Sequence, residues 1–122
     1  MCGICGLFGT GRPIAEGRSI VDGMMKALAH RGPDGEGRAE GAGVVLGHRR
    51  LSIIDVEGGA QPMISGDGRY ALTFNGEIYN YLELKRELTD EGVRFHTSSD
   101  AEVLLEILIR RGEKALTQLN GM

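Results

Sequence analysis

The pattern of apolar and small residues in the first third of the chain predicts a strand followed by a helix. Residues 2–8 form a short apolar segment punctuated by glycine, as in a buried strand that another part of the chain approaches closely. From Ser19 onward, apolar residues recur at helical spacing, which predicts a core-facing amphipathic helix with Ser19 as its N-cap. The helix should end near His30, because Gly32 and Pro33 follow it.

The middle of the chain predicts further strands. Residues 44–55 consist of two apolar runs separated by His48, Arg49 and Arg50. Another strand is expected at residues 70–74, after turns rich in glycine.

The last part of the chain is mainly helical in its pattern. Two segments open with a capping-box sequence, in which a polar N-cap residue is followed three positions later by glutamate; the N-caps are Asn80 and Ser99. The predicted elements are helices at residues 80–91 and 99–111, a short strand at 93–96, and a last helical segment at 113–120, with Gly92 and Gly121 closing the first and last helices.

Composition restricts the class of protein. At 122 residues the chain is one domain or part of one. Its 20 glycines are about twice the usual share of roughly 7% and are spread along the chain, which indicates many tight turns and close backbone approaches. A net charge of −3 with dispersed basic residues argues against a nucleic-acid surface. No signal peptide or long apolar run is recognisable, so we expect a cytoplasmic protein with no membrane segment.

Cys2 is the first candidate for chemistry. Once Met1 is removed, Cys2 carries a thiol and a free α-amino group on one carbon, and the amine can take the proton of the thiol. The alternative is a cysteine that only packs, since cysteine is among the most buried residue types. Cys2 and Cys5 form a C-x-x-C pair, which could be a redox couple or half of a zinc site. A redox motif should lie where a strand meets a helix, and no second cysteine pair completes a zinc site, so we expect neither redox use nor a metal.

Basic and acidic side chains provide candidates for ligand binding. An unpaired charge between two buried runs is costly, so one residue of the basic triplet is expected to meet an anion, and Arg49 or Arg50 suits a carboxylate better than His48. A solvated edge or an internal ion pair explains the triplet equally well. Arg31 and Asp34 either pair to order a loop near the site or belong to a charged connector.

Asn75 and Gly76 end the strand predicted at residues 70–74. An Asn-Gly pair commonly forms a hairpin turn, but the segment that follows has a helical pattern and not that of a second strand. Between a strand and a helix, the Asn75 amide and the Gly76 N–H could point at one spot, as the donors of an oxyanion hole do. Asp100, near a predicted helix N-terminus, is favoured by the helix dipole and could equally bind the ammonium group of a ligand.

Five motifs in order resemble the glutamine amidotransferase domain of glutamine-hydrolysing asparagine synthetases. They are Met1-Cys2-Gly3-Ile4, His30-Arg31-Gly32-Pro33-Asp34-Gly35, Arg50-Leu51-Ser52-Ile53-Ile54-Asp55, Asn75-Gly76-Glu77-Ile78-Tyr79-Asn80 and Ser99-Asp100-Ala101-Glu102. The resemblance implies an α+β fold, the four-layer αββα sandwich of the N-terminal-nucleophile hydrolases. Because the family continues beyond this length, residues 1–122 are expected to be a truncated N-terminal part of that domain, without the ATP-binding synthetase domain.

The resemblance also implies roles for individual residues. Cys2 would be the nucleophile, and Asn75 and Gly76 the oxyanion hole. Arg50 would hold the α-carboxylate of glutamine, with Asp100 and Glu77 at its ammonium end. The implied substrate-binding set is Arg50, Leu51, Ile54, Asn75, Gly76, Glu77 and Asp100.

The function implied is hydrolysis of the L-glutamine side-chain amide through a Cys2 thioester, supplying ammonia for ATP-dependent synthesis of asparagine from aspartate. No cofactor is expected in these residues, while ATP and Mg²⁺ are expected in the missing synthetase domain. The expected partners are glutamine and that domain, and a homodimer is compatible with the resemblance. Two alternatives are a sister amidotransferase with another acceptor and a non-catalytic ligand-binding domain, although the latter should have lost the nucleophile or the oxyanion pair.

Overall fold

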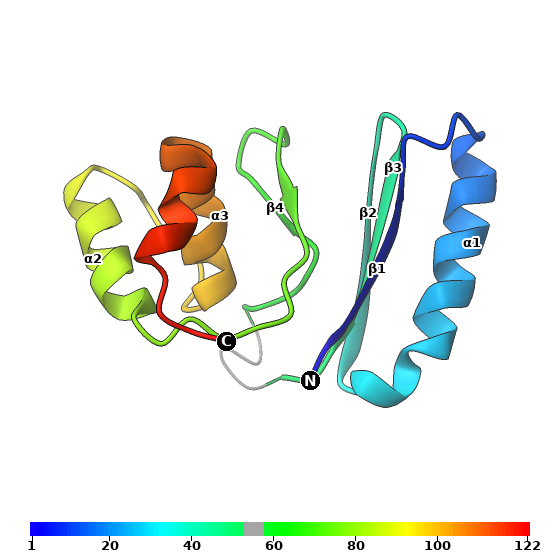
Figure 1. Ribbon diagram of the computed structural model, residues 1–122, viewed down its shortest axis with the longest axis horizontal. Coiled ribbons are helices and arrows are strands. Elements are labelled where there is room, and N and C mark those ends of the chain that lie inside the picture. The colour runs from blue at the N-terminus through cyan, green and yellow to red at the C-terminus, as the bar shows by residue number, and fades with distance from the viewer. Residues whose placement is uncertain (53–57) are drawn as a thin grey trace. The chain divides into compact units, whose positions relative to one another are not determined.

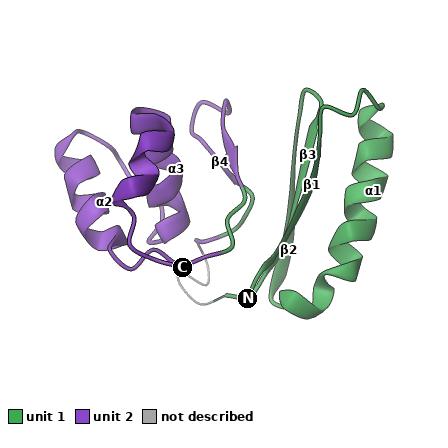
Figure 2. Ribbon diagram, viewed as in Figure 1, with its two compact units in different colours: residues 1–52, 60–62, 73–75 green, residues 53–59, 63–72, 76–122 purple. Residues whose placement is uncertain are grey.

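The computed structural model describes residues 1–52 and 58–122 and shows a mixed α/β chain that divides into two compact units (Figure 2). The first unit comprises Met1–Ser52, Ala60–Pro62 and Thr73–Asn75, and the second contains Met63–Leu72 and Gly76–Met122. None of the helices in the described residues is long and apolar enough to span a membrane.

The first unit is a three-stranded antiparallel sheet with one helix on it. The strands are β1 (Gly3–Phe8), β2 (Gly35–Gly41) and β3 (Val44–Arg50), in the order β1-β3-β2. Helix α1 (Ile14–Ala27) lies along one face of the sheet (Figure 1), where Val21 and Met25 pack against Val45. The strand expected at residues 2–8 is confirmed. Its alternation directs Cys5 and Leu7 to the helix.

Helix α1 begins earlier than the sequence pattern indicates. Its N-cap is Pro13, whose carbonyl accepts the N–H groups of Glu16 and Gly17, so the predicted N-cap Ser19 lies within the helix. The apolar pattern does not show this first part of the helix, because Gly17 occupies a buried position on the same face as Val21 but has no apolar side chain. A Cβ at Gly17 would lie 3.3 Å from Val45 Cγ2, so glycine allows the helix to approach the sheet. The α-helix ends at Ala27, and a 3₁₀ turn, η1 (Ala29–Arg31), follows.

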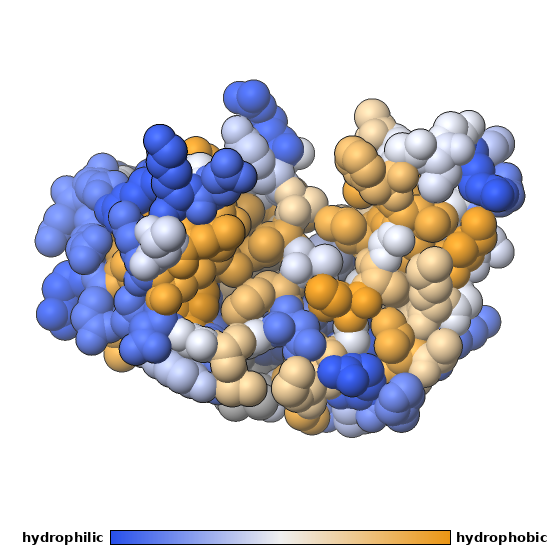
Figure 3. Space-filling view, in the orientation of Figure 1, coloured by the Kyte–Doolittle hydropathy of each residue, from blue (hydrophilic) through white to orange (hydrophobic). Residues whose placement is uncertain are grey.

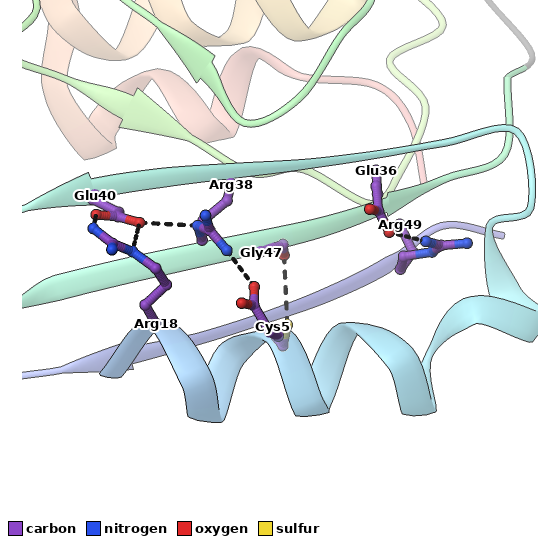
Figure 4. Close-up of polar contacts among 8 residues, drawn as sticks. Cys5, Arg18, Glu36, Arg38, Glu40, Gly47 and Arg49 are labelled. Atoms are coloured by element: carbon purple, nitrogen blue, oxygen red, sulfur yellow. Dashed lines mark hydrogen bonds and ion pairs between the residues drawn. The ribbon is translucent and has the colours of Figure 1, made fainter. Parts of the chain in front are cut away.

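Strand β2 was not foreseen, because its sequence alternates charged with small residues. Its charged residues face α1 and form ion pairs at the border of the sheet (Figure 4). Arg18 donates two hydrogen bonds of 2.7 Å to Glu40, and Arg38 pairs with Asp22 and Glu40. The pair with Arg18 lowers the pKa of the Glu40 carboxyl.

The small residues of β2 occupy the opposite face of the sheet. A Cβ at Gly37 would overlap the carbonyl oxygen of Gln61, so the segment Ala60–Pro62 lies directly on the strand there. The side-chain oxygen of Gln61 accepts the N–H of Phe74 at 2.6 Å. Residues 60–62 and 73–75 therefore form a second layer of the first unit, on the face away from α1.

The second unit is mainly helical. It contains a short hairpin of β4 (Met63–Ile64) and β5 (Ala71–Leu72), helices α2 (Tyr81–Asp90) and α3 (Asp100–Arg111), and the 3₁₀ segment η2 (Gly112–Gln118). Hydrophobic residues gather in the middle of this unit, over α3, and hydrophilic residues cover its rim beside α2 (Figure 3). Its buried apolar residues include Leu84, Leu88, Val103, Leu104 and Ile107. The two predicted helices are confirmed, as is Gly92 with a positive φ of 92° after α2.

Three local predictions in the second unit are wrong. Asn80 does not cap α2 with its side chain, which instead binds the backbone of Gln118 and Asn120. Residues 93–96 are not a strand, because the Glu102 carboxylate accepts the N–H of His96 and thereby satisfies this backbone locally.

The Ser99 N-cap, in contrast, is confirmed, since its side chain accepts the N–H of Ala101 at 3.1 Å.

The third wrong prediction is that Gly121 closes the last helix. It pairs with Ile78 in an isolated antiparallel bridge and does not cap a helix. A Cβ at Gly121 would overlap the carbonyl oxygen of Glu77, whose N–H and carbonyl both bond to Met122 at 2.9 Å. Glycine is required here by this close approach of two backbone segments.

Replacing Gly37 by alanine should destabilise the first unit. The new methyl group meets the Gln61 backbone, which cannot move aside as a flexible side chain can, so we expect a loss of about 1 to 3 kcal/mol in the free energy of unfolding. Gly41→Ala on the same strand is the control, because its Cβ would meet no atom within 4 Å. Urea denaturation of both variants measures the difference, and equal midpoints would contradict this packing.

Candidate active site

Cys2 is held at the entry to β1 by contacts with the end of β3. The backbone N–H of Leu51 donates to Cys2 Sγ at 3.3 Å, and the thiol lies 3.6 Å from the Leu51 carbonyl oxygen. Arg31 Nε donates to the Cys2 carbonyl at 3.1 Å. Because backbone and sulfur are both held, the side chain is fixed in direction while remaining partly accessible.

The loop between η1 and β2 is ordered by backbone contacts with β3 and the residues after it. Arg31 and Asp34, whose pairing was one of two open interpretations, bind other groups: Arg31 binds Cys2, and the Asp34 carboxylate accepts the Ser52 N–H at 2.8 Å. A Cβ at Gly32 would overlap the Arg49 carbonyl. The Arg-Gly-Pro-Asp loop is therefore ordered by its contacts with Cys2 and with the end of β3. An ion pair between Arg31 and Asp34 does not order it.

The three basic residues of β3 have different surroundings. Arg49 faces α1, pairs with Glu36 (Figure 4), and donates to the Gly32 carbonyl at 3.2 Å, so the internal ion pair is the correct interpretation for Arg49. His48 and Arg50 alternate with it and lie on the opposite face of the sheet, the face covered by residues 60–62. Arg50 therefore lies on the same face of the sheet as His48, away from α1.

His48 is fully buried, which the sequence did not indicate. Its Nδ1 lies 2.9 Å from Thr73 Oγ1. Burial, and to a lesser degree the charge of Arg50, lowers the pKa of His48 to about 4, so the ring is neutral at physiological pH. Its place at the end of the apolar run of residues 44–46 is the only local signal of burial, and it does not identify Thr73 as the partner.

Asn75 follows Thr73 in the second layer of the first unit, and Gly76 begins a segment of the second unit. The pair does not form a hairpin turn, because α2 follows it after a short connection. The strand predicted at residues 70–74 is shorter in the structure, where β5 is Ala71–Leu72, but Asn75-Gly76 does lie between a strand and a helix, as predicted.

In the second unit, Asp100 supports the segment that follows Gly76. Its carboxylate is buried, and Oδ2 accepts the Ile78 N–H at 3.0 Å. The neighbouring Glu77 has its backbone bonded to Met122. Asp100 thus lies beside the stretch that carries Glu77.

The predicted residues are distributed over both units. The first contains Cys2, Arg50, Leu51 and Asn75, of which Cys2 and Leu51 are in direct contact. The second contains Gly76, Glu77 and Asp100. Ile54, also predicted to bind substrate, lies outside the described residues.

Cys5 is separated from Cys2 by the geometry of the strand. It packs with the core under α1, and its thiol lies 3.8 Å from the Gly47 carbonyl oxygen. Burial raises the pKa of the Cys5 thiol, which makes it a poor nucleophile. Residues three apart on a strand point to opposite faces, so this C-x-x-C sequence does not present two sulfurs to one metal or one disulfide.

The neutral, buried His48 should make the protein less stable in acid. The unfolded chain binds a proton at this ring below its ordinary pKa of about 6.5, whereas the folded chain does so only near 4. Stability from this group is complete above pH 6.5 and is lost as pH falls toward 4, by about 2.5 kcal/mol between pH 7 and 4.5. Urea denaturation at a series of pH values measures it, and His48→Asn should show a shallower decline over the same range.

A pocket of about 330 Å³ in the first unit lies away from these residues. It is lined by the end of β1, the β2–β3 turn and the start of α1, including Leu7, Arg12 and Gly17. Cys2 lies at the other end of β1, so this pocket has no part in the chemistry considered below.

Comparison with known proteins places the chain in a family. A model of the glutamine amidotransferase domain matches residues 1–122. Asparagine synthetase [glutamine-hydrolyzing] 1 of Bacillus subtilis (strain 168) is 45% identical over 125 residues, covering 100% of this chain and 20% of the relative. Asparagine synthetase B [glutamine-hydrolyzing] of Escherichia coli (strain K12) is 38% identical over 122 residues, covering 100% of this chain and 22% of the relative.

The asparagine synthetase [glutamine-hydrolyzing] of Asparagus officinalis is 38% identical over 122 residues, with coverage of 100% of this chain and 20% of the relative. The chain thus spans about a fifth of the length of these curated relatives. The family model, in contrast, is matched over the whole chain, with Cys2 and the Asn75-Gly76 pair inside the match. The chain belongs to the glutamine amidotransferase domain family.

Proposed function

We propose that this chain hydrolyses the side-chain amide of L-glutamine with Cys2 as the nucleophile. The observation that carries the proposal is the position of the Cys2 sulfur, which is partly accessible at the tip of a central sheet and 3.3 Å from the Leu51 nitrogen. The matched family and the names of the relatives support glutamine as the substrate.

The reaction begins with transfer of a proton from the thiol. After removal of Met1, the α-amino group of Cys2 takes this proton, and the thiolate attacks the amide carbon of glutamine. The resulting oxyanion accepts hydrogen bonds from the Asn75 carboxamide and the Gly76 N–H. The carbon–nitrogen bond then breaks, the ammonium proton passes to the departing nitrogen, and ammonia leaves a γ-glutamyl thioester. Water attacks the thioester, releasing glutamate and restoring the thiol.

Charged residues bind the two ends of the amino acid in this proposal. Arg50 holds the α-carboxylate, because its planar guanidinium can donate two parallel hydrogen bonds. Asp100 and Glu77 bind the α-ammonium group. Asp100 uses Oδ2 for the Ile78 N–H, which leaves Oδ1 as the acceptor for the substrate. Leu51 and Ile54 are further substrate contacts in this proposal.

The proposal extends to the fold and to the whole protein. A sheet with α1 on one face and further chain on the other is consistent with half of an αββα sandwich. We propose that ammonia passes to aspartate activated by ATP as β-aspartyl-adenylate, with ATP and Mg²⁺ bound by residues outside this chain. The names of relatives five times as long support asparagine as the product. A homodimer and a cytoplasmic location stay predictions.

Cys2→Ala in the full-length protein should reduce glutamine hydrolysis to the background rate, since no other group supplies the nucleophile. Cys5→Ala is the control and should retain activity, because Cys5 packs under α1 on the other face of β1. Release of glutamate and ammonia measures both. An N-terminal tag that stays attached should act like Cys2→Ala, and unchanged turnover with such a tag would exclude the α-amino group as base.

Arg50→Lys should raise the KM for glutamine on the order of tenfold while kcat changes less, because the ammonium of lysine cannot replace the bidentate contact. Arg38→Lys is the matched control. Arg38 pairs with Asp22 and Glu40 on the α1 face, so its replacement should leave KM unchanged. Steady-state kinetics of glutaminase activity distinguishes them, and equal KM values would remove Arg50 from the substrate site.

A further inference from the structure

His48 connects the central strand of the first unit to the segment that carries Asn75. Its ring leaves β3 on the face opposite to α1, and Nδ1 meets Thr73 Oγ1 at 2.9 Å. Thr73 lies two residues before Asn75. A second contact follows at once, since the Gln61 side chain accepts the Phe74 N–H at 2.6 Å. Two successive residues before Asn75 are thus tied to side chains of the first unit.

Both hydrogen-bond partners, His48 and Gln61, are held by the sheet that follows Cys2. The Gln61 backbone lies against Gly37 on β2, and Gly37 is paired in register with His48 on β3. In the same sheet, the first residue of β1, Gly3, pairs with Arg49. The strand that follows Cys2 and the segment that ends at Asn75 are therefore anchored to one set of antiparallel strands.

Stability alone does not explain a histidine at this position. The ring is fully buried, and its Nε2 has no hydrogen-bond partner among the described residues. A buried polar atom without a partner costs about 1 to 3 kcal/mol, which an apolar side chain would avoid. Protonation would bring a second positive charge to a buried place beside Arg50. Burial and the charge of Arg50 both disfavour the protonated ring, so His48 acts there as a neutral hydrogen-bonding group.

We propose that His48 is a positioning residue of the glutaminase site: by its hydrogen bond to Thr73, it holds the Asn75 carboxamide where the oxyanion forms when Cys2 attacks. This inference rests on the proposed function. His48 does not touch the substrate, and its effect reaches the reaction through Thr73 and Asn75. Displacing an oxyanion donor weakens an interaction that is made in the transition state, so the loss should appear in kcat and not in KM.

The test begins with Thr73→Val in the full-length protein, which removes Oγ1 with little change in volume. We expect kcat for glutamine hydrolysis to fall on the order of ten- to a hundredfold, with KM within about twofold of wild type. Alkylation of Cys2 by iodoacetamide should keep its rate, because the nucleophile is untouched. The control is Thr89→Val on α2, which also loses a hydroxyl hydrogen bond, to Lys85, but should leave kcat unchanged.

Conservative variants separate positioning from general packing. His48→Asn keeps an amide near the place of Nδ1 and should retain more kcat than His48→Leu, which has no hydrogen-bonding group. Thr73→Ser keeps Oγ and should recover most of the kcat lost in Thr73→Val. If both members of each pair lose kcat equally, or if the loss lies in KM, the hydrogen bond does not position the site and the proposal is overturned.

The decisive experiment is the double-mutant cycle with Asn75→Ala. If His48 and Thr73 act through Asn75, adding Thr73→Val to Asn75→Ala should cause no further fall in kcat, whereas independent roles would make the two losses multiply. Multiplying losses overturn the proposal. Failure of the proposed function is seen separately, since it would appear as glutamine hydrolysis that is absent from wild type or persists in Cys2→Ala.

Discussion

The antiparallel register of β1 against β3 is the constraint on which the arrangement of this chain depends. With Gly3 opposite Arg49 and Cys5 opposite Gly47, Cys5 faces α1 and Cys2 reaches the backbone of Leu51. Because successive side chains on a strand alternate between faces, a slip of one residue would bury the first sulfur under the helix and present the second. Leu7 and Cys5 of β1 pack against the core of Val21, Met25 and Val45, and this packing opposes such a slip.

The same register places the paired charges of β2 and β3 on one face of the sheet and Arg50 on the other. On the α1 face, Arg49 is paired with Glu36, and the other charges of β2 are paired with charges of α1. On the opposite face, Arg50 has a neutral imidazole beside it on the strand. The neighbouring ring therefore adds no positive charge to that of the Arg50 guanidinium.

Glycine allows the close contacts that hold the candidate site together. At Gly32, Gly37 and Gly121, a Cβ would overlap a carbonyl oxygen of another segment, so at each position two backbones meet directly. Two of these contacts lie in the first unit: the loop with Arg31 closes on β3, and the Gln61 segment closes on β2. Close packing of backbone therefore explains glycine at these three positions, whereas others, such as Gly43 and Gly92, adopt a positive φ in open surroundings.

The sequence by itself determined the main elements, the strand that begins beside Cys2, the helical second half and the five motifs that identify the family. These depend on local periodicity and on the chemistry of single residues, which can be read along the chain. Only the tertiary structure decided that Arg31 binds the Cys2 carbonyl, that Arg49 is an internal ion pair, and that His48 reaches Thr73. It also revealed β2, in which Gly37 is explained by the distant segment that carries Gln61. Partners of this kind are set by long-range pairing and burial, and no local pattern carries that information.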